Sequence, residues 1–158
     1  MNKITTIEDV KALIAAGVEE NTTIEYKSGI NIADAKWKGE MAKDVSAMAN
    51  ANGGVIIYGV KEFDEKDKRH IPSQITPLDT TKISKETIAQ VISSNISPKI
   101  KGLEINCLVV DVSKPNEVVY IITIPQSSTA HQNLKTKQYH KRYSTTVDSM
   151  EDYEIRDI

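Results

Sequence analysis

The chain has 158 residues, of which 39% are hydrophobic and 27% charged, as is typical of one globular domain. The single cysteine, Cys107, excludes an internal disulfide framework and a cysteine-based zinc site. Because 20 lysines and arginines nearly balance 22 aspartates and glutamates, for a formal net charge of −2, contact with nucleic acid requires a local cluster of positive charge.

Apolar residues at helical spacing predict helices over residues 6–16, 38–50, 84–96 and 149–158. Thr5 or Thr6 caps the first, which ends at Gly17, and Ser84 caps the third. The last helix continues to Ile158 without a cap, so we expect the chain to be the N-terminal part of a longer protein.

Alternating or continuous apolar segments predict strands over residues 22–27, 55–60, 103–112, 117–124 and 139–143. The segment 55–60 (VIIYGV) is apolar on both faces, which is typical of a central strand. Crossovers are mixed with a hairpin, so we predict a single α+β domain over residues 1–158. We expect a mixed sheet of about five to six strands with helices packed on it.

The sequence also bears on location. No run approaches the roughly 18 apolar residues of a membrane span, and the opening residues MNKIT lack the apolar core of a secretory signal. We therefore expect a soluble, cytoplasmic protein that does not bind membranes.

The pair Gly53–Gly54 invites comparison with phosphate-binding loops. Such loops place their glycines before a helix, where free N–H groups attract anions, and this pair instead follows a helix and precedes a strand. We interpret the pair as a tight helix-to-strand turn and exclude a Walker-type ATPase for this segment.

Three acidic residues lie in or next to predicted strands: Glu20 precedes the strand 22–27, Glu25 lies within it, and Glu62 follows the strand 55–60. Converging carboxylates are the ligands that Mg²⁺ or Mn²⁺ requires, and a metal held in this way polarises a phosphate and activates a water. The alternative is that all three are solvated surface charges, as carboxylates usually are.

Residues 131–142 combine positive charge with aromatic and histidine side chains and contain no acid. The residues that we expect to contact nucleic acid in this basic strip are Lys135, Lys137, His140, Lys141 and Arg142. Its cations would neutralise phosphates, with help from Lys27, and its tyrosines would stack on unpaired bases. The alternative is a solvated hairpin arm with ordinary lysines.

Other candidates for chemistry are given ordinary roles. His70, His131 and His140 lack the spacing of two ligands on one helix face, so we interpret them as non-ligands. Cys107 alternates with Ile105 along a predicted strand, which favours a buried, unreactive thiol.

Several segments together resemble one known family. Residues 20–27 (ENTTIEYK) resemble the E-x-x-x-x-E-[FY]-K opening of the Schlafen-type Alba-like domain, and residues 45–60 (VSAMANANGGVIIYGV) are similar to its A-x-A-N-x-x-G-G core. Residues 96–98 (ISP), 119–125 (VYIITIP) and 139–142 (YHKR) follow its second half in order. The positions that this resemblance marks as structural are Asn50, Gly53, Gly54 and Gly59.

The resemblance implies an α+β fold of the Alba type. Bacterial members commonly begin longer proteins described as transcriptional regulators or ATP-binding proteins. Some members cleave tRNA or rRNA with a metal held by three acids, which correspond to Glu20, Glu25 and Glu62. Two positions depart from the family pattern: Lys61 replaces one of two acids after the G-V motif, and Ser144 replaces the glycine of an Arg-x-Gly motif.

Three functions follow. The first is a nucleic-acid-binding module of a transcriptional regulator, acting on DNA or RNA through the basic strip without a fixed cofactor. The second is an endoribonuclease that uses Mg²⁺ or Mn²⁺ at the acidic trio. The third is a nucleotide-sensing or protein-assembly domain, in which pairing of strand edges would give a homo-oligomer.

Overall fold

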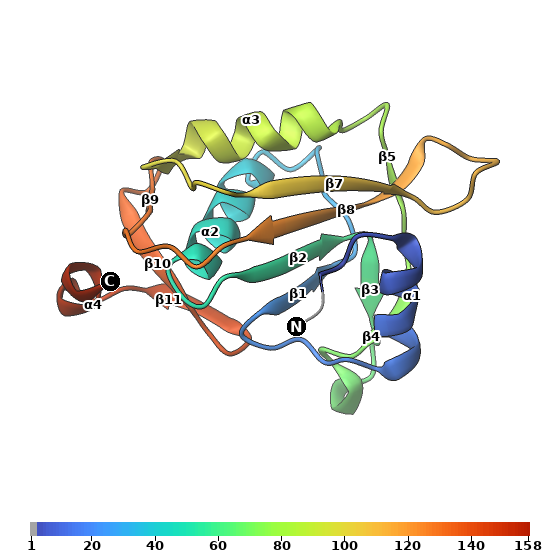
Figure 1. Ribbon diagram of the computed structural model, residues 1–158, viewed down its shortest axis with the longest axis horizontal. Coiled ribbons are helices and arrows are strands. Elements are labelled where there is room, and N and C mark those ends of the chain that lie inside the picture. Colours follow the sequence, from blue (N-terminus) through green and yellow to red (C-terminus); the bar gives the residue numbers. More distant parts are fainter. Residues whose placement is uncertain (1–2) are drawn as a thin grey trace.

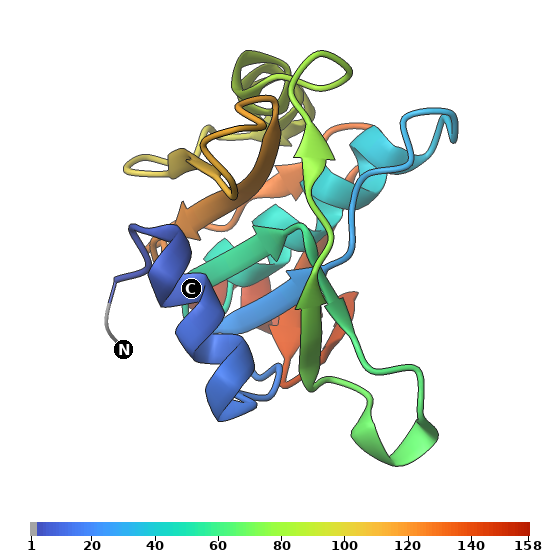
Figure 2. The ribbon, with the colours of Figure 1, turned by 90° about the vertical axis from the view of Figure 1, so that its right-hand side faces the viewer.

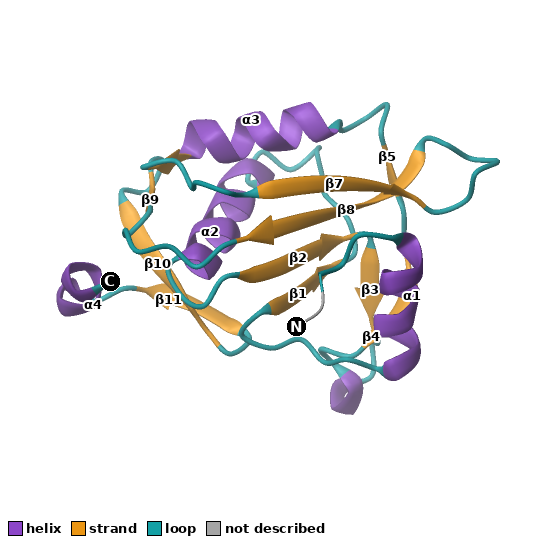
Figure 3. Ribbon diagram, viewed as in Figure 1, coloured by secondary structure: helices purple, strands orange, loops and turns teal. Residues whose placement is uncertain are grey.

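The computed structural model describes residues 3–158, so the first two residues of the predicted 1–158 domain lie outside the described residues. The helices are α1 (Ile7–Ala16), α2 (Trp37–Ala49), α3 (Lys85–Asn95) and α4 (Asp152–Asp157), with a 3-10 turn at Lys66–Lys68. The strands are β1 (Ile24–Lys27), β2 (Gly54–Tyr58), β3 (Val60–Glu62), β4 (Pro72–Ile75), β5 (Leu78–Asp79), β6 (Ile96–Ser97), β7 (Glu104–Val109), β8 (Glu117–Ile124), β9 (Gln132–Asn133), β10 (Gln138–Tyr143) and β11 (Thr146–Ser149). Figure 3 shows where the helices and strands lie in the fold.

The main sheet has five strands in the order β1-β2-β8-β5, with β7 also paired to β8. Only β1 and β2 run parallel, while the pairings of β8 with β2, β5 and β7 are antiparallel. Figure 1 shows β7 and β1 at opposite margins of this sheet. The predicted α+β fold with a mixed sheet and packed helices is confirmed.

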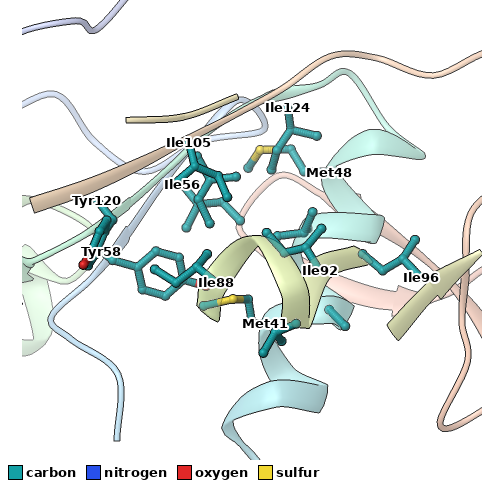
Figure 4. Packing of buried hydrophobic residues seen from close by; sticks show 14 of the residues in the cluster. Met41, Met48, Ile56, Tyr58, Ile88, Ile92, Ile96, Ile105, Tyr120 and Ile124 are labelled. Atoms are coloured by element: carbon teal, nitrogen blue, oxygen red, sulfur yellow. The ribbon is translucent and has the colours of Figure 1, made fainter. Parts of the chain in front are cut away.

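Side chains alternate between two cores across this sheet. Ile56 of β2 and Ile122 of β8 pack with α2 and α3 on one face (Figure 4), while Ile57 and Ile121 pack with Val10 of α1 on the other. Covering both faces explains why the central strands are apolar at consecutive positions. Figure 2 shows α1 on its own side of the sheet.

A smaller sheet, β11-β10-β9-β6, packs against α2. Asn50, directly after α2, is 3% exposed and joins the two layers. Its side-chain amide donates to the carbonyls of His131 and His140 at 3.0 and 2.8 Å, and its Oδ1 accepts the His131 N–H at 2.8 Å. This amide therefore fixes β10 beside the helix.

Gly54 makes the entry to β2, where the chain has almost no room. Its φ is +143°, and a Cβ at this position would collide with the carbonyl of Thr23. The close approach places β2 beside β1, the strand that carries Glu25.

Three local expectations are wrong. The predicted strand 55–60 is two strands, because Gly59 with φ of +115° turns the chain between β2 and β3. The short strands β4, β5, β6, β9 and β11 were not predicted. Cys107 is exposed rather than buried. It lies on β7, an edge strand of the main sheet, and its two neighbours along the strand are also partly exposed.

Within residues 3–158, no helix has both the length and the apolar character needed to cross a membrane.

Candidate functional site

A groove of about 640 Å³ lies where β1 ends and β3 begins, and we call it the acidic groove. It is lined by Glu20, Glu25, Tyr26, Lys27, Ser28, Val60, Lys61, Glu62, Phe63, Asp64, Arg69 and Thr145. The three predicted acids thus line one depression, although Glu20 precedes β1 and Glu62 ends β3. Parallel strands bring their carboxyl ends to the same edge of a sheet. Because β1 and β2 are parallel, Lys27 at the end of β1 lies near the segment that leads from β2 to Glu62.

Two of these acids meet a histidine. Ligand atoms of Glu20, Glu62 and His70 all lie within 4.8 Å of one another. His70 Nδ1 is 3.2 Å from Glu20 Oε1 and 3.6 Å from Glu62 Oε2. From its spacing along the chain, His70 was interpreted as a non-ligand. The hairpin of β3 and β4 nevertheless folds it back beside Glu20 and Glu62.

The position of Glu20 follows from the open edge of β1. An edge strand has backbone N–H groups that no neighbouring strand can bind. The carboxylate of Glu20 accepts the Tyr26 N–H at 3.1 Å, and the backbone N–H of Glu20 donates to the His70 carbonyl at 2.8 Å. One residue thus satisfies the strand edge and connects it to the hairpin.

Glu25 lines the groove but does not belong to the His70 cluster. Its side chain is 9% exposed and lies between two cations, with Oε1 3.3 Å from Lys27 Nζ and Oε2 3.2 Å from Arg142 Nη1. Oε2 is buried and receives no hydrogen bond, because the Arg142 contact lacks hydrogen-bond geometry. Two cations balance this acid from within the protein.

Arg142 is a buried support of the groove. Its side chain is 1% exposed, and its guanidinium donates to the Asn21 carbonyl at 3.1 and 2.9 Å and to the Ile24 carbonyl at 3.3 Å. The guanidinium thus completes the edge of β1 on the side that Glu20 leaves open, and it is not free to contact a phosphate at the surface.

Lys27 also connects the groove to α2. Its Nζ lies 3.3 Å from Asp44 Oδ2, in addition to its contact with Glu25. Burial acts to lower the pKa of Lys27, but Asp44 and Glu25 outweigh it and raise that pKa. Burial and the nearby Glu25 raise the pKa of Asp44 to about 6, although Lys27 opposes the shift.

Glu62 has the ligand chemistry that a cation requires. Burial and the charge of Glu20 raise the pKa of Glu62, against an opposing effect of His70. Its Oε2 is buried and has no hydrogen-bond partner among the described residues. Carboxylate oxygens and an imidazole nitrogen suit Mn²⁺ and carboxylates suit Mg²⁺, so Glu20, Glu62 and His70 fit a divalent cation better than the predicted trio does.

The basic strip is divided by the structure. Arg142 and His140 project from the buried face of β10 and are 2% and 5% exposed. Lys141 lies on the other face, 3.7 Å from Glu154 of α4, whereas Lys135 and Lys137 are exposed in the turn between β9 and β10. The strip is therefore not one surface.

Lys135 instead lies near one lysine of α2 and the lysine that directly precedes this helix. With Lys36, Lys43, Glu40 and His140 it lines a groove of about 300 Å³ between the helix and the β9–β10 turn. We call this the lysine groove. Its three lysines exceed its one acid, so it has the local positive charge that the chain as a whole lacks.

Comparison with known proteins agrees with this fold and these motifs. The protein is an α+β domain with an acidic groove where β1 ends and β3 begins, and a lysine groove between α2 and the β9–β10 turn. The family model Schlafen, AlbA_2 matches residues 20–151, and the chain belongs to this family.

A solved structure has the same fold. The crystal structure of the DIP2311 protein from Corynebacterium diphtheriae superposes with a TM-score of 0.55 at 14% sequence identity, covering 91% of this chain. This identity supports the fold alone, and the chain spans 26% of the length of that protein. No curated protein matches the chain.

Sequence reasoning missed Asp44, His70 and Lys43, as well as the buried role of Arg142. The positions of Asp44 and His70 depend on contacts across the sheet, which no local spacing indicates. One signal was present: side chains alternate along a strand, so His140 and Arg142 must face opposite to Lys141.

Proposed function

We propose that this domain binds nucleic acid through backbone phosphates, as the DNA- or RNA-binding module of a regulatory protein. The observation that supports it is the lysine groove, where Lys36, Lys43 and Lys135 outnumber the single acid Glu40. This groove has the local positive charge that binding to backbone phosphates requires.

The two grooves differ in charge and would therefore interact differently with a nucleic acid backbone. Lysines attract phosphates at long range and release counterions on binding. The acidic groove repels phosphates unless a cation neutralises it, and its rim carries Lys61 and Arg69. Membership of the Schlafen, AlbA_2 family is consistent with a nucleic-acid partner at this coarse level.

Fluorescence anisotropy with labelled single- and double-stranded DNA and RNA tests the proposal. We expect binding at low salt that weakens when Lys36 and Lys135 are changed to methionine. Absence of binding to every oligonucleotide at low salt contradicts it. An oligomer that responds to neither oligonucleotide nor metal favours an assembly domain instead.

A second candidate function is a metal-dependent endoribonuclease. The unpartnered, buried Oε2 of Glu62 beside Glu20 and His70 favours it. A divalent cation there would supply charge stabilisation for a phosphodiester and an activated water. Glu20, Glu62 and His70 would hold that cation, while Arg142 and Lys27 form ion pairs with the neighbouring Glu25.

Incubation of structured RNA with the protein and Mn²⁺ tests this candidate. We expect cleavage that Glu62→Gln abolishes and that the exposed Glu65→Gln leaves unchanged. Intact RNA after prolonged incubation with metal contradicts an endoribonuclease and leaves the binding function standing.

A further inference from the structure

The lysine groove has a buried imidazole in its wall. His140 is 5% exposed and lines the groove together with Lys36, Lys43 and Lys135. Its Nδ1 is buried and has no hydrogen-bond partner among the described residues. Buried polar atoms in folded proteins are nearly always satisfied, and a ligand is one way to satisfy them.

The other buried imidazole of the domain is fully satisfied. His131 is 2% exposed, with Nδ1 2.6 Å from the Pro98 carbonyl and Nε2 2.7 Å from Ser127 Oγ. Both ring nitrogens of His131, which supports the fold, thus have partners within the protein. His140 lacks such a partner at the position where it meets a charged groove.

The charges that face His140 are mainly positive. Glu40 and Lys43 come from α2, Lys36 directly precedes this helix, and Lys135 comes from the β9–β10 turn. Burial and Lys43 lower the pKa of His140, so the ring favours its neutral form. An anion between these groups would reverse the effect of Lys43 and accept a hydrogen bond from the ring.

The groove suits a phosphate group better than a carboxylate. A phosphate offers three or more acceptor oxygens in different directions, which matches donors from two separate chain segments. A lysine ammonium binds phosphate as a compact point charge with three donors. The concave shape confines one such group rather than spreading the contact over a flat face.

We propose that the lysine groove holds one phosphate group of a nucleic acid strand, bound by Lys36, Lys43 and Lys135 and completed by a hydrogen bond from His140. This inference rests on the proposed nucleic-acid function and adds a built pocket to it. The group is either a terminal monoester or an internal diester, since both offer anionic non-bridging oxygens to the lysines and to His140.

Histidine resonances of the whole chain, followed by NMR, test the pocket. The protein is titrated with inorganic phosphate, with a 5′-phosphorylated oligonucleotide and with the same oligonucleotide bearing a 5′-hydroxyl. We expect the His140 signals to shift and the pKa of His140 to rise, while His131 stays constant. A response confined to the phosphorylated strand identifies a monoester, and equal responses identify a diester.

Two variants complete the design. Lys43→Met should weaken inorganic phosphate binding by roughly tenfold or more, whereas Lys137→Met, on the same turn but outside the groove, should leave it unchanged. If His140 does not respond while oligonucleotides still bind, the pocket is wrong and the proposed function stands. If His140 responds to inorganic phosphate but no oligonucleotide binds, the nucleic-acid source is wrong and both proposals fall.

Discussion

The guanidinium of Arg142 lies 3.2 Å from Glu25 Oε2 while donating to the Asn21 and Ile24 carbonyls, so a cation of the last third of the chain completes the edge of β1. Glu25, which the sequence assigns to the acidic trio, and Arg142, which it assigns to the basic strip, thus form one buried ion pair. The acidic groove depends on this pair for its shape.

Removing Arg142 should therefore destabilise the fold. Arg142→Met leaves Glu25 buried without one of its two counter-charges and removes the guanidinium donors of the Asn21 and Ile24 carbonyls, and the unfolding free energy should fall by about 3–5 kcal/mol. Urea unfolding measures it, with the exposed Lys137→Met as a control that changes stability by less than about 0.5 kcal/mol. The double change with Glu25→Gln should recover part of the loss, and an additive double variant would refute the coupling.

Asp44 should titrate near neutrality. The pKa of its carboxyl is raised from 3.8 to about 6 by burial and Glu25, and Lys27 limits the rise. Carbon NMR should give a midpoint of about 6, and Lys27→Met should move it higher. A midpoint at the ordinary value of 3.8 contradicts the buried Glu25–Lys27–Asp44 arrangement.

The same carboxyl makes stability depend on pH. Between its unfolded pKa of 3.8 and its folded pKa of about 6, the folded state holds more protons than the unfolded state. The contribution of Asp44 to the unfolding free energy should therefore fall as the pH rises through this window. Unfolding curves from pH 4 to 7 should lose this component in Asp44→Asn, and an unchanged profile would count against it.

Gly54 should tolerate no side chain. A Cβ there meets the Thr23 backbone, so Gly54→Ala must push β2 away from β1, with a loss of more than about 4 kcal/mol. Gly29→Ala is the matched control, because no atom lies within 4 Å of its Cβ position. Thermal unfolding compares the two, and equal melting temperatures would show that the strands are not so closely spaced.

Cation binding should depend on the cluster around His70. Glu62→Gln removes a carboxylate whose Oε2 has no hydrogen-bond partner among residues 3–158, so Mn²⁺ affinity measured by calorimetry should fall by at least about tenfold. Glu65→Gln, an exposed change of equal charge, should leave the affinity unaltered. Equal affinities for the two variants would place any bound cation elsewhere.

The sequence predicted helices and strands correctly where a single hydrophobic pattern extends over the whole element. Continuous apolar runs identified the central strands, and Thr6 and Ser84 cap α1 and α3 as predicted. The short strands were missed because two-residue pairs such as β9 carry no periodicity. One strand was predicted across Gly59 because the residues on both sides of it are apolar.

The candidate site followed from the sequence only in part. Spacing singled out Glu20, Glu25 and Glu62, and all three line one groove. It did not supply His70 or Asp44, because their places depend on tertiary contacts between a hairpin, a helix and a sheet edge. Charge alone grouped Arg142 with Lys135, although strand alternation buries one and the turn exposes the other.

The salt dependence of oligonucleotide binding tests the central claim most directly. For a protein that binds phosphates through the lysine groove, the affinity falls steeply with salt, and changing Lys36 and Lys135 to methionine lowers the slope by about 1 for each lysine. Changing Lys11 and Lys114, exposed lysines of α1 and the β7–β8 loop, makes an equal change of charge and should leave the slope unaltered. Equal slopes for both double variants, or no binding at low salt, would contradict the account.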